Sequence, residues 1–259
     1  MSSTNSLANW RALDEQLGRD CLRIASYNVH GCVGGDGAAD PVRVAEVIQE
    51  LSCDTVGLQE VHRLEVLGPR TGMTVVEGVP HMWHERHVGN ALLTRRKVLG
   101  VRHHEYGWAG GEPRSALDVD LESDAGHKLR VIVTHLGLRP AERRFQVKQL
   151  LTLIKHTSLD EPVVVLGDIN EWLPLGRPLR WLHALLGHSP AERSFPARWP
   201  LFALDRVWTR PRSALLAFGV HRSALAALAS DHLPVKAIIA THPLRHADAA
   251  QGASLRAVG

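Results

Sequence analysis

The chain has 259 residues, 44% of them hydrophobic and 22% charged, which is the composition of an ordinary globular protein. This length allows one large domain or two small ones, and no stretch approaches the roughly 18 apolar residues of a membrane-spanning helix. The formal net charge of +3 permits an anionic partner without requiring one, since no long run of Lys or Arg occurs.

The opening residues and the cysteines indicate the cellular compartment in which the protein works. Residues 1–20 are polar and lack the apolar core of a secretory signal. The three cysteines, Cys21, Cys32 and Cys53, form neither a CxxC pair nor a disulfide framework, which fits a reducing compartment. We therefore expect a cytoplasmic protein that works as a monomer.

The first half of the chain begins with a strand at 22–29 and a glycine-rich loop at 31–40. This loop lacks the lysine of a P-loop and does not complete GxGxxG, so we interpret it as a flexible loop. Residues 41–51 start with Pro and repeat apolar residues at helical spacing, which predicts a helix. A second strand at 54–60 follows. Further short strands are predicted at 73–79, 90–94, 97–102, 115–121 and 129–134.

The second half alternates helices with strands. A helix is predicted at 141–156, a buried strand at 163–167 and a helical stretch at 178–186. Closing strands are predicted at 203–208 and 234–240. The pattern indicates one layered α/β domain over residues 21–242, with an N-terminal extension at 1–20 and a disordered tail at 243–259.

Polar residues stand at or near the ends of several of these strands. They are Asn28, Glu60, His135, Asp168, Asn170, Asp205, Asp231 and His232. In layered α/β folds the side chains at neighbouring strand ends converge on one crevice. Each has a structural alternative: Glu60, for instance, could pair with Arg63 on a surface turn. The whole set is explained better by a cation or a phosphate among the side chains, because buried acids without partners are costly.

The motifs YNVHG, LQEVHR, GNALLTR, PRSAL, VTHLGL, GDINEW, LDRVW and SDHLPV occur in this order over about residues 22–240. Their order resembles the endonuclease/exonuclease/phosphatase superfamily of metal-dependent phosphoesterases. GDxN followed by LDR and SDH is the specific part of the match. The resemblance implies an α/β (α+β) fold, a four-layer sandwich of two packed β-sheets flanked by helices, with a hydrolytic site at one edge.

The resemblance also implies roles around a metal ion. Glu60 would be the principal ligand of Mg²⁺ or Mn²⁺, with Asn28 assisting, and Asp205 would support the site or bind a second metal. Hard oxygen ligands suit Mg²⁺, and no His/Cys cluster suggests zinc.

The remaining roles concern water and phosphate. Asp168 would orient or deprotonate the attacking water, and Asn170 would donate to a phosphate oxygen. His232, oriented by Asp231, would contact the phosphate or share the base role. His135 would stabilise the phosphate or protonate the leaving oxygen.

Two features bear on the branch of the family. Abasic-site endonucleases carry a tyrosine motif where this chain has Thr134-His135-Leu136, so we expect the deoxyribonuclease, sphingomyelinase or phosphatase branches instead. The chain also resembles uncharacterised bacterial members that share HLGLR…R…Q, GDxN-[DE]-W and the stretch RSFPARWPLFALDRVW. That stretch either walls the substrate cleft or packs as a core loop.

Further candidates surround the motifs. Arg114 and Arg139 are possible phosphate-binding residues, with surface solvation as the alternative. Trp172 and Trp199 could stack on a base or lie at a lipid headgroup, although ordinary packing is the commoner role.

The leading hypothesis is a phosphodiesterase acting on nucleic acid, a phospholipid headgroup or a small phosphodiester. A catalytically inactive phosphate-binding module of the same fold is the alternative. The sequence shows neither a strong basic stripe nor an amphipathic anchor that would separate a nuclease from a lipid enzyme.

Overall fold

A computed structural model describes residue 10 and residues 21–83, 86–108, 110–124, 126–158 and 161–241. The proposed N-terminal extension, apart from Trp10, and the proposed tail at 243–259 lie outside the described residues. Among the helices of the described part, none combines the length and hydrophobicity that a membrane span requires.

The first sheet has six strands in the order β12-β13-β1-β2-β6-β3. They are β1 (Cys21–Asn28), β2 (Thr55–Gln59), β3 (Thr74–Glu77), β6 (Ala91–Thr94), β12 (Leu215–Val220) and β13 (Val235–Ala240). Only β1 and β2 pair in parallel, so these two neighbours end at the same edge of the sheet.

The second sheet has five strands in the order β11-β10-β9-β8-β7. They are β7 (Val98–Tyr106), β8 (Arg114–Glu122), β9 (Lys128–His135), β10 (Val163–Asp168) and β11 (Asp205–Arg210). Here β9 and β10 form the parallel pair. A separate two-stranded ribbon consists of β4 (His81–Trp83) and β5 (Arg86–Val88).

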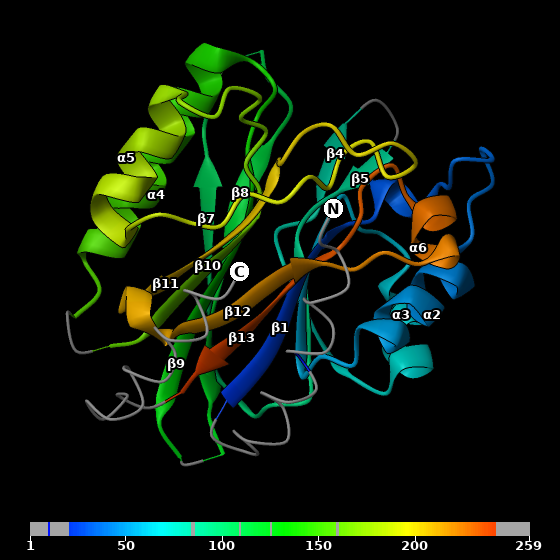
Figure 1. The fold of residues 1–259 in the computed structure, drawn as a ribbon, viewed down its shortest axis with the longest axis horizontal. Helices are drawn as coiled ribbons and strands as arrows, with labels where there is room; N and C mark the ends of the chain where they lie inside the picture. The colour runs from blue at the N-terminus through cyan, green and yellow to red at the C-terminus, as the bar shows by residue number, and fades with distance from the viewer. Residues whose placement is uncertain are drawn as a thin grey trace.

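Helices cover the outer faces of both sheets (Figure 1). The helices α2 (Pro41–Leu51), α3 (Leu64–Thr71) and α6 (Ala224–Ala229) lie on the first sheet, and α4 (Pro140–Lys155) and α5 (Arg177–Leu186) lie on the second. Two 3-10 turns, η1 (His30–Cys32) and η2 (Arg212–Ala214), complete the described elements. The α/β/β/α order confirms the predicted four-layer sandwich.

Three apolar clusters hold the layers together. The central one lies between the sheets and includes Ile24, Val133 and Leu166. The two outer clusters join each sheet to its helices. At Gly57 the sheets approach so closely that an added Cβ would lie 2.4 Å from Leu166 Cδ1. Because interiors are close-packed, this contact holds the two sheets at a fixed separation.

Local chemistry explains the elements that the sequence predicts. Asp40 caps α2 by accepting a hydrogen bond from Arg43 N at 3.0 Å, and Pro41 occupies the first turn. Every residue of β10 is buried, which fits a strand covered on both faces.

The sequence prediction missed several elements and shortened another. α3, β12, α6 and the β4/β5 ribbon were not predicted, and β7 extends to Tyr106 rather than ending at 102. α3 contains Gly68 and Pro69, residues that disfavour helix interiors, and it is held by burial of Leu67 and Thr71. Packing overrides propensity there.

Candidate active site

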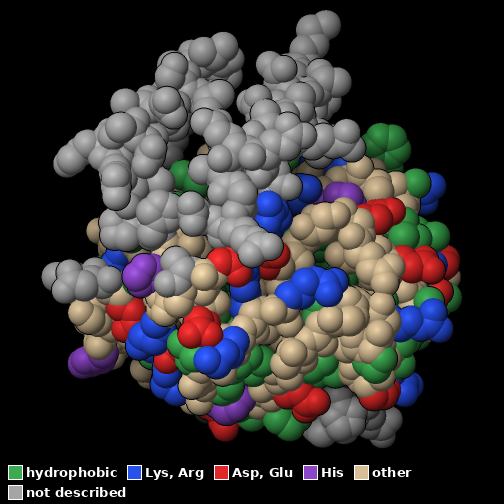
Figure 2. Space-filling model, turned by 90° about the horizontal axis from the view of Figure 1, so that it is seen from below, with side chains coloured by type: hydrophobic (Ala, Val, Ile, Leu, Met, Phe, Trp, Pro, Cys, Tyr) green, Lys and Arg blue, Asp and Glu red, His purple; other side chains and the backbone are tan. Residues whose placement is uncertain are grey.

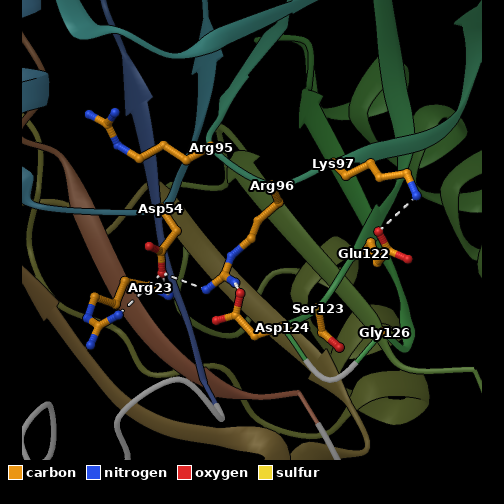
Figure 3. Close-up of a pocket in the computed structure, with 9 residues that line it drawn as sticks. All are labelled: Arg23, Asp54, Arg95, Arg96, Lys97, Glu122, Ser123, Asp124 and Gly126. Carbon is orange, nitrogen blue, oxygen red and sulfur yellow. Dashed lines mark hydrogen bonds and ion pairs between the residues drawn. The ribbon is translucent and has the colours of Figure 1, made fainter.

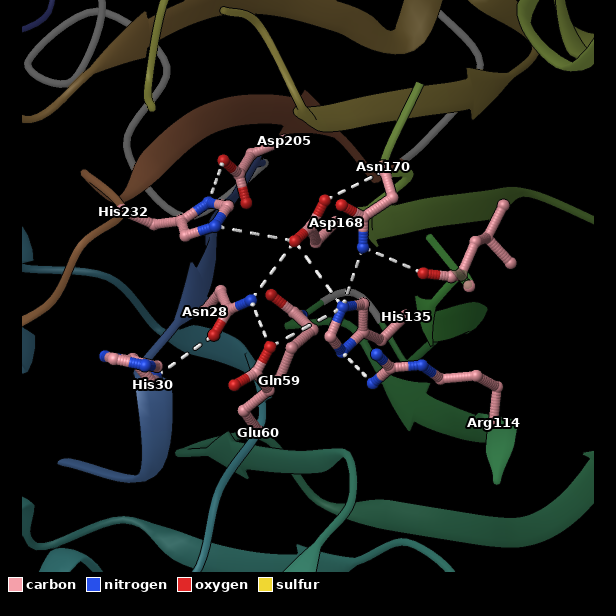
Figure 4. A network of polar contacts seen from close by, with 12 residues as sticks. Asn28, His30, Gln59, Glu60, Arg114, His135, Asp168, Asn170, Asp205 and His232 are labelled. Carbon is pink, nitrogen blue, oxygen red and sulfur yellow. Dashed lines mark hydrogen bonds and ion pairs between the residues drawn. The ribbon is translucent and has the colours of Figure 1, made fainter. Parts of the chain in front are cut away.

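The polar residues at the strand ends meet at one edge of the sandwich (Figure 4). Asn28 ends β1, His135 ends β9 and Asp168 ends β10, while Asp205 begins β11. Glu60 follows β2 and His232 precedes β13. Hydrogen bonds and close ion contacts connect all of these side chains. The parallel pairs make this possible, because each brings two strand ends to the same edge.

The turn after β10 positions two of these side chains. Gly167 has φ 147°, and an added Cβ would lie 1.7 Å from Thr134 O, so only glycine fits there. Asn170 also has a positive φ, 52°, a conformation that asparagine tolerates, and its N–H donates to Asp168 Oδ1 at 2.9 Å. The segment is therefore a tight turn and not the extended strand end that the spacing of Asp168 and Asn170 suggested.

The Asp168 carboxylate lies at the centre of the network. Its Oδ2 accepts a hydrogen bond from Asn28 Nδ2 at 3.1 Å. The same oxygen is 3.5 Å from His135 Nε2 and 3.6 Å from His232 Nε2. Burial raises the pKa of Asp168 to about 6; the charge of His232 opposes this rise and that of Asp205 adds to it.

His232 is held by Asp205. Its Nδ1 donates to Asp205 Oδ2 at 2.9 Å, and Ser194 Oγ donates to the same oxygen. Burial by itself lowers the pKa of His232, but the charges of Asp205 and Asp168 outweigh it and raise that pKa to about 10. The two carboxylates thus favour the protonated form of His232.

The prediction that Asp231 orients His232 is wrong. Asp231 Oδ1 accepts from Ser230 Oγ at 3.4 Å and lies 3.8 Å from His30 Nδ1. Asp205 takes the orienting position because the antiparallel register sets it opposite Asp168, beside the ring.

His135 is held from behind by Arg114. Arg114 Nη1 lies 2.8 Å from His135 Nδ1, and Arg114 Nη2 donates to Glu112 Oε2 at 2.8 Å. A guanidinium can only donate, so His135 Nδ1 accepts and the neutral ring carries its proton on Nε2. Burial and the Arg114 charge hold the pKa of His135 well below its usual range.

This geometry excludes the alternative that Arg114 is a solvated surface residue. Its side chain is buried, and both of its terminal nitrogens are directed at Glu112 and His135. The described contacts of Arg114 are thus with residues of the protein, and its contact with a phosphate stays a prediction. Arg139 lies outside the network: it is exposed and donates to Gly110 O at 3.2 Å.

Asn170 and His135 present two donors side by side. Asn170 Nδ2 donates to Leu136 O at 2.8 Å and lies 3.1 Å from His135 Nε2. Since Nε2 carries a proton, neither nitrogen accepts from the other. The pair is suited to an anionic oxygen placed between them.

Glu60 lies at the more open side of the network. Its side chain is 28% exposed, and its backbone has φ 52°, a strained conformation for glutamate. Glu60 Oε1 accepts from Asn28 Nδ2 at 3.2 Å and is 3.8 Å from His135 Nε2. The alternative in which Glu60 pairs with Arg63 does not occur among the described contacts, where Arg63 lies 3.8 Å from Glu65.

Asn28 does not offer the oxygen expected of a metal ligand. Its Oδ1 accepts from His30 N at 3.0 Å, which turns its nitrogen toward Glu60 and Asp168. Asn28 therefore positions the two carboxylates. Asp168, Asp205 and His232 form a group whose ligand atoms lie within 4.8 Å of one another, as a metal site would require.

A buried ion pair supports the loops around the site, and sequence reasoning gave it no role. Arg143 Nε donates to Glu171 Oε2 at 3.1 Å, and Arg143 Nη1 donates to Leu138 O at 2.8 Å. Gln146 Oε1 accepts from Gly137 N at 2.7 Å. The HLGLR…R…Q and N-[DE]-W patterns contain these residues. The spacing of Arg143 and Gln146, about one turn apart on α4, is the sequence signal that could have identified them.

Aromatic residues line one side of the site. The Phe195 ring is 4.7 Å from the His232 ring, and Trp172 packs edge-on against Phe195 and Phe202. Phe195 and Phe202, in the stretch before β11, thus form a wall of the site, as one of the two interpretations held. Trp172 is part of this wall, and Trp199 is exposed.

A separate cavity of about 730 Å³ lies at the opposite ends of the strands (Figure 3). Arg96 contacts Asp54 at 3.4 Å and also pairs with Asp124, while Lys97 pairs with Glu122 at 3.1 Å. The view from below shows basic and acidic side chains mixed on this face (Figure 2). The described acidic and basic side chains of this cavity pair with one another and do not converge on a common space as those of Figure 4 do.

Comparison with known proteins places the chain in a family of enzymes. The family model described as "Endonuclease/Exonuclease/phosphatase family" matches residues 25–232. The uncharacterized protein YbhP of Escherichia coli strain K12 is 29% identical over 252 residues, covering 88% of this chain and 99% of that protein.

Solved structures share the fold. The endonuclease/exonuclease/phosphatase from Bacteroides vulgatus superimposes with a TM-score of 0.72 at 20% identity, covering 85% of this chain and 98% of that one. D. rerio TDP2, solved in complex with a single-strand DNA product, gives a TM-score of 0.63 at 19% identity, covering 84% and 98%.

Proposed function

This chain belongs to the endonuclease/exonuclease/phosphatase family, and from that premise we propose that it is a metal-dependent phosphodiesterase. The observation that carries the proposal is the position of Asp168 Oδ2, within 3.6 Å of the ring nitrogens of both His135 and His232. One carboxylate and two donors of different charge thus face a common space, which is the arrangement that water attack on a phosphate ester needs.

Asp168 acts on the attacking water in this proposal. With its pKa raised to about 6, its carboxylate is ionised at neutral pH and still basic enough to take a proton. Its Oδ1 is held by Asn170 N and its Oδ2 by Asn28 Nδ2. These bonds direct the carboxylate toward the substrate.

His232, His135 and Asn170 bind the phosphate. His232 contributes a positive charge and a donor, so it serves as an electrostatic partner and not as a base. His135 Nε2–H and Asn170 Nδ2–H contribute neutral donors. Together they stabilise the negative charge that grows on the phosphoryl oxygens as water adds.

Glu60 is the residue that best fits a divalent cation. Its carboxylate is partly exposed and faces no Lys or Arg among its described contacts, and hard oxygen ligands suit Mg²⁺ or Mn²⁺. His232 is less suited as a ligand because its nitrogens carry protons. A bound cation would supply charge neutralisation at the phosphate. Asp205 is assigned to orient His232.

Hydrolysis of bis(p-nitrophenyl) phosphate, and of its monoester counterpart, tests the proposal. We expect diester cleavage that EDTA abolishes and Mg²⁺ or Mn²⁺ restores. Asp168→Asn and His232→Gln should each lower the rate by at least about a hundredfold. Glu65→Gln, an exposed acid outside the network, is the matched control and should leave the rate unchanged.

The outcomes separate the enzyme from a binding module. Near wild-type rates in both site variants would refute the proposal. Binding of a phosphate analogue without turnover of either ester, under any metal, would support the inactive phosphate-binding alternative instead.

A further inference from the structure

Three loops beside the active site expose apolar side chains. We name them the apolar rim: residues 136–139 after β9, residues 172–176 before α5, and residues 193–203 before β11. Ten large hydrophobic residues are exposed in the described part of the chain, and seven of them lie in these loops. They are Leu138, Trp172, Leu173, Leu175, Trp199, Leu201 and Phe202. This concentration is not the scattered exposure of an ordinary surface.

The rim is an ordered structure. Phe195 and Phe202 pair across an isolated β-bridge that closes the third loop, so Trp199 and Leu201 lie at its tip. In the second loop Leu173 N donates to Glu171 Oε1, and Gly176 N donates to Leu173 O. Leu175 is 82% and Trp199 is 76% exposed in spite of these bonds. The backbone therefore holds apolar side chains outward.

The rim is continuous with the active site. Trp172 of the second loop packs on Phe195 and Phe202 of the third, and Phe195 packs on the His232 ring at 4.7 Å. Arg143 ties the first loop to the second through Leu138 O and Glu171. A molecule that touches the rim is thus directly beside the phosphate-binding groups.

The charges of the rim are of one sign. Its loops and the first turn of α5 carry the exposed arginines Arg139, Arg177, Arg180, Arg193 and Arg198. Residues 136–139, 172–180 and 193–203 contain no Asp or Glu. Among the described residues none of these arginines forms an ion pair. The rim therefore combines outward leucine and tryptophan with unopposed positive charge.

We propose that the apolar rim docks on an anionic lipid surface and so brings a headgroup phosphodiester to the site. Outward leucines insert among acyl chains, tryptophan favours the headgroup level, and arginine attracts anionic headgroups. Single-stranded nucleic acid fits less well, because bases stack on aromatic rings and offer no aliphatic surface for Leu173, Leu175 and Leu201. This inference rests on the proposed phosphodiesterase.

Vesicle sedimentation tests the proposal with the full chain. Vesicles of phosphatidylcholine alone are compared with vesicles that also contain phosphatidylglycerol, and the anionic ones should bind more tightly. Leu175→Ser with Leu201→Ser should weaken that binding roughly tenfold or more, since two leucines no longer insert. Arg177→Gln and Arg198→Gln should weaken it about fivefold each.

Matched controls place the effect at the rim. Leu99→Ser with Leu228→Ser removes two exposed leucines elsewhere and should leave vesicle binding unchanged. The rim variants should keep the wild-type circular dichroism spectrum and the wild-type rate on the soluble diester. Equal vesicle binding by the two double variants would overturn the proposal.

The same set distinguishes failure of docking from failure of catalysis. Diester hydrolysis without vesicle binding would refute docking and leave the phosphodiesterase intact. Rim-dependent vesicle binding without hydrolysis would support docking and refute the enzyme. If the rim variants lose binding to a single-stranded oligonucleotide but the wild type ignores vesicles, the rim serves nucleic acid and the lipid proposal is overturned.

Discussion

Two clusters of buried charge lie on the five-stranded sheet, one at its edge and one on its helix-covered face. In the second cluster Asp118 accepts hydrogen bonds from Arg102 and Arg130, and His104 Nε2 lies 3.0 Å from it. Burial alone raises the pKa of Asp118, but the bonds from Arg130 and Arg102 outweigh burial and hold that pKa below its usual range.

In the active-site cluster, burial outweighs the favourable charges around the acid. Among the described residues, no guanidinium contacts Asp168, and the nearest cation is His232, which Asp168 shares with Asp205. Burial accordingly raises the pKa of Asp168. On the same sheet, a buried acid is compatible with a stable fold where guanidinium groups bond it directly, as Arg102 and Arg130 bond Asp118. Where no guanidinium bonds it, as at Asp168, the buried acid keeps a raised pKa and is available for chemistry.

Asp168→Asn should produce the largest effect and sharpen the contrast. We expect a loss of about a thousandfold in diester hydrolysis, because the water loses its proton acceptor. A raised pKa means that ionised Asp168 opposes folding at neutral pH, so the variant should unfold at an equal or higher urea concentration in EDTA. Lower stability together with retained activity would reverse the assignment of the two clusters.

Asp118→Asn should show the converse. Removing one member of a buried ion cluster costs about 3 kcal/mol of unfolding free energy. Hydrolysis per folded molecule should stay within about twofold, since the side chain lies on the helix-covered face, away from the edge that holds the site. Urea denaturation and diester assays on the same preparation measure both. A large loss of activity in fully folded variant would break the comparison.

The lowered pKa of Asp118 also predicts how the stability lost in this variant depends on pH. An acid whose pKa is lowered by folding contributes stability above its unfolded pKa, near 3.8, and loses it as the pH falls toward the folded value. The stability difference between wild type and Asp118→Asn should therefore be constant above about pH 5 and shrink below pH 4. Comparing the two proteins cancels the titration of the other acids. A difference that grows in acid would contradict this sign.

Arg114→Met tests the contact between the Arg114 guanidinium and the His135 ring. Arg114 holds His135 Nδ1 as an acceptor, so its loss should release the ring to both tautomers and lower hydrolysis about tenfold or more. Nitrogen NMR of the His135 ring distinguishes the tautomers directly. Glu112 loses a partner too, so the spectrum, rather than stability, is the deciding measurement.

Much of the architecture followed from local sequence. The apolar run of β10 and the Pro-led amphipathic pattern of α2 predicted those elements because burial and capping act within each segment. α6 and β12 were missed because a six-residue, alanine-rich helix and a short edge strand with a register shift gain their stability from neighbours. The local sequence pattern of such segments does not reveal the tertiary contacts that stabilise them.

The membership of the site was easier to predict than its pairings. Polar residues at strand ends are visible in sequence, but the partner of His232 depends on the β10–β11 register that sets Asp205 opposite Asp168. The family resemblance implied Asp231, the sequence neighbour of His232, because the resemblance does not reveal this register. Likewise the position of Arg114 behind His135 depends on the pairing of β8 with β9.

Lys97→Ala should have the smallest effect and isolate the role of burial. Lys97 pairs with Glu122 at 3.1 Å in the cavity at the opposite ends of the strands, but its side chain is 70% exposed (Figure 3). Water screens such a pair, so its loss should change the unfolding free energy by less than about 0.5 kcal/mol in urea titration. A loss as large as that of Asp118→Asn would mean that pairing alone, without burial, stabilises the second sheet.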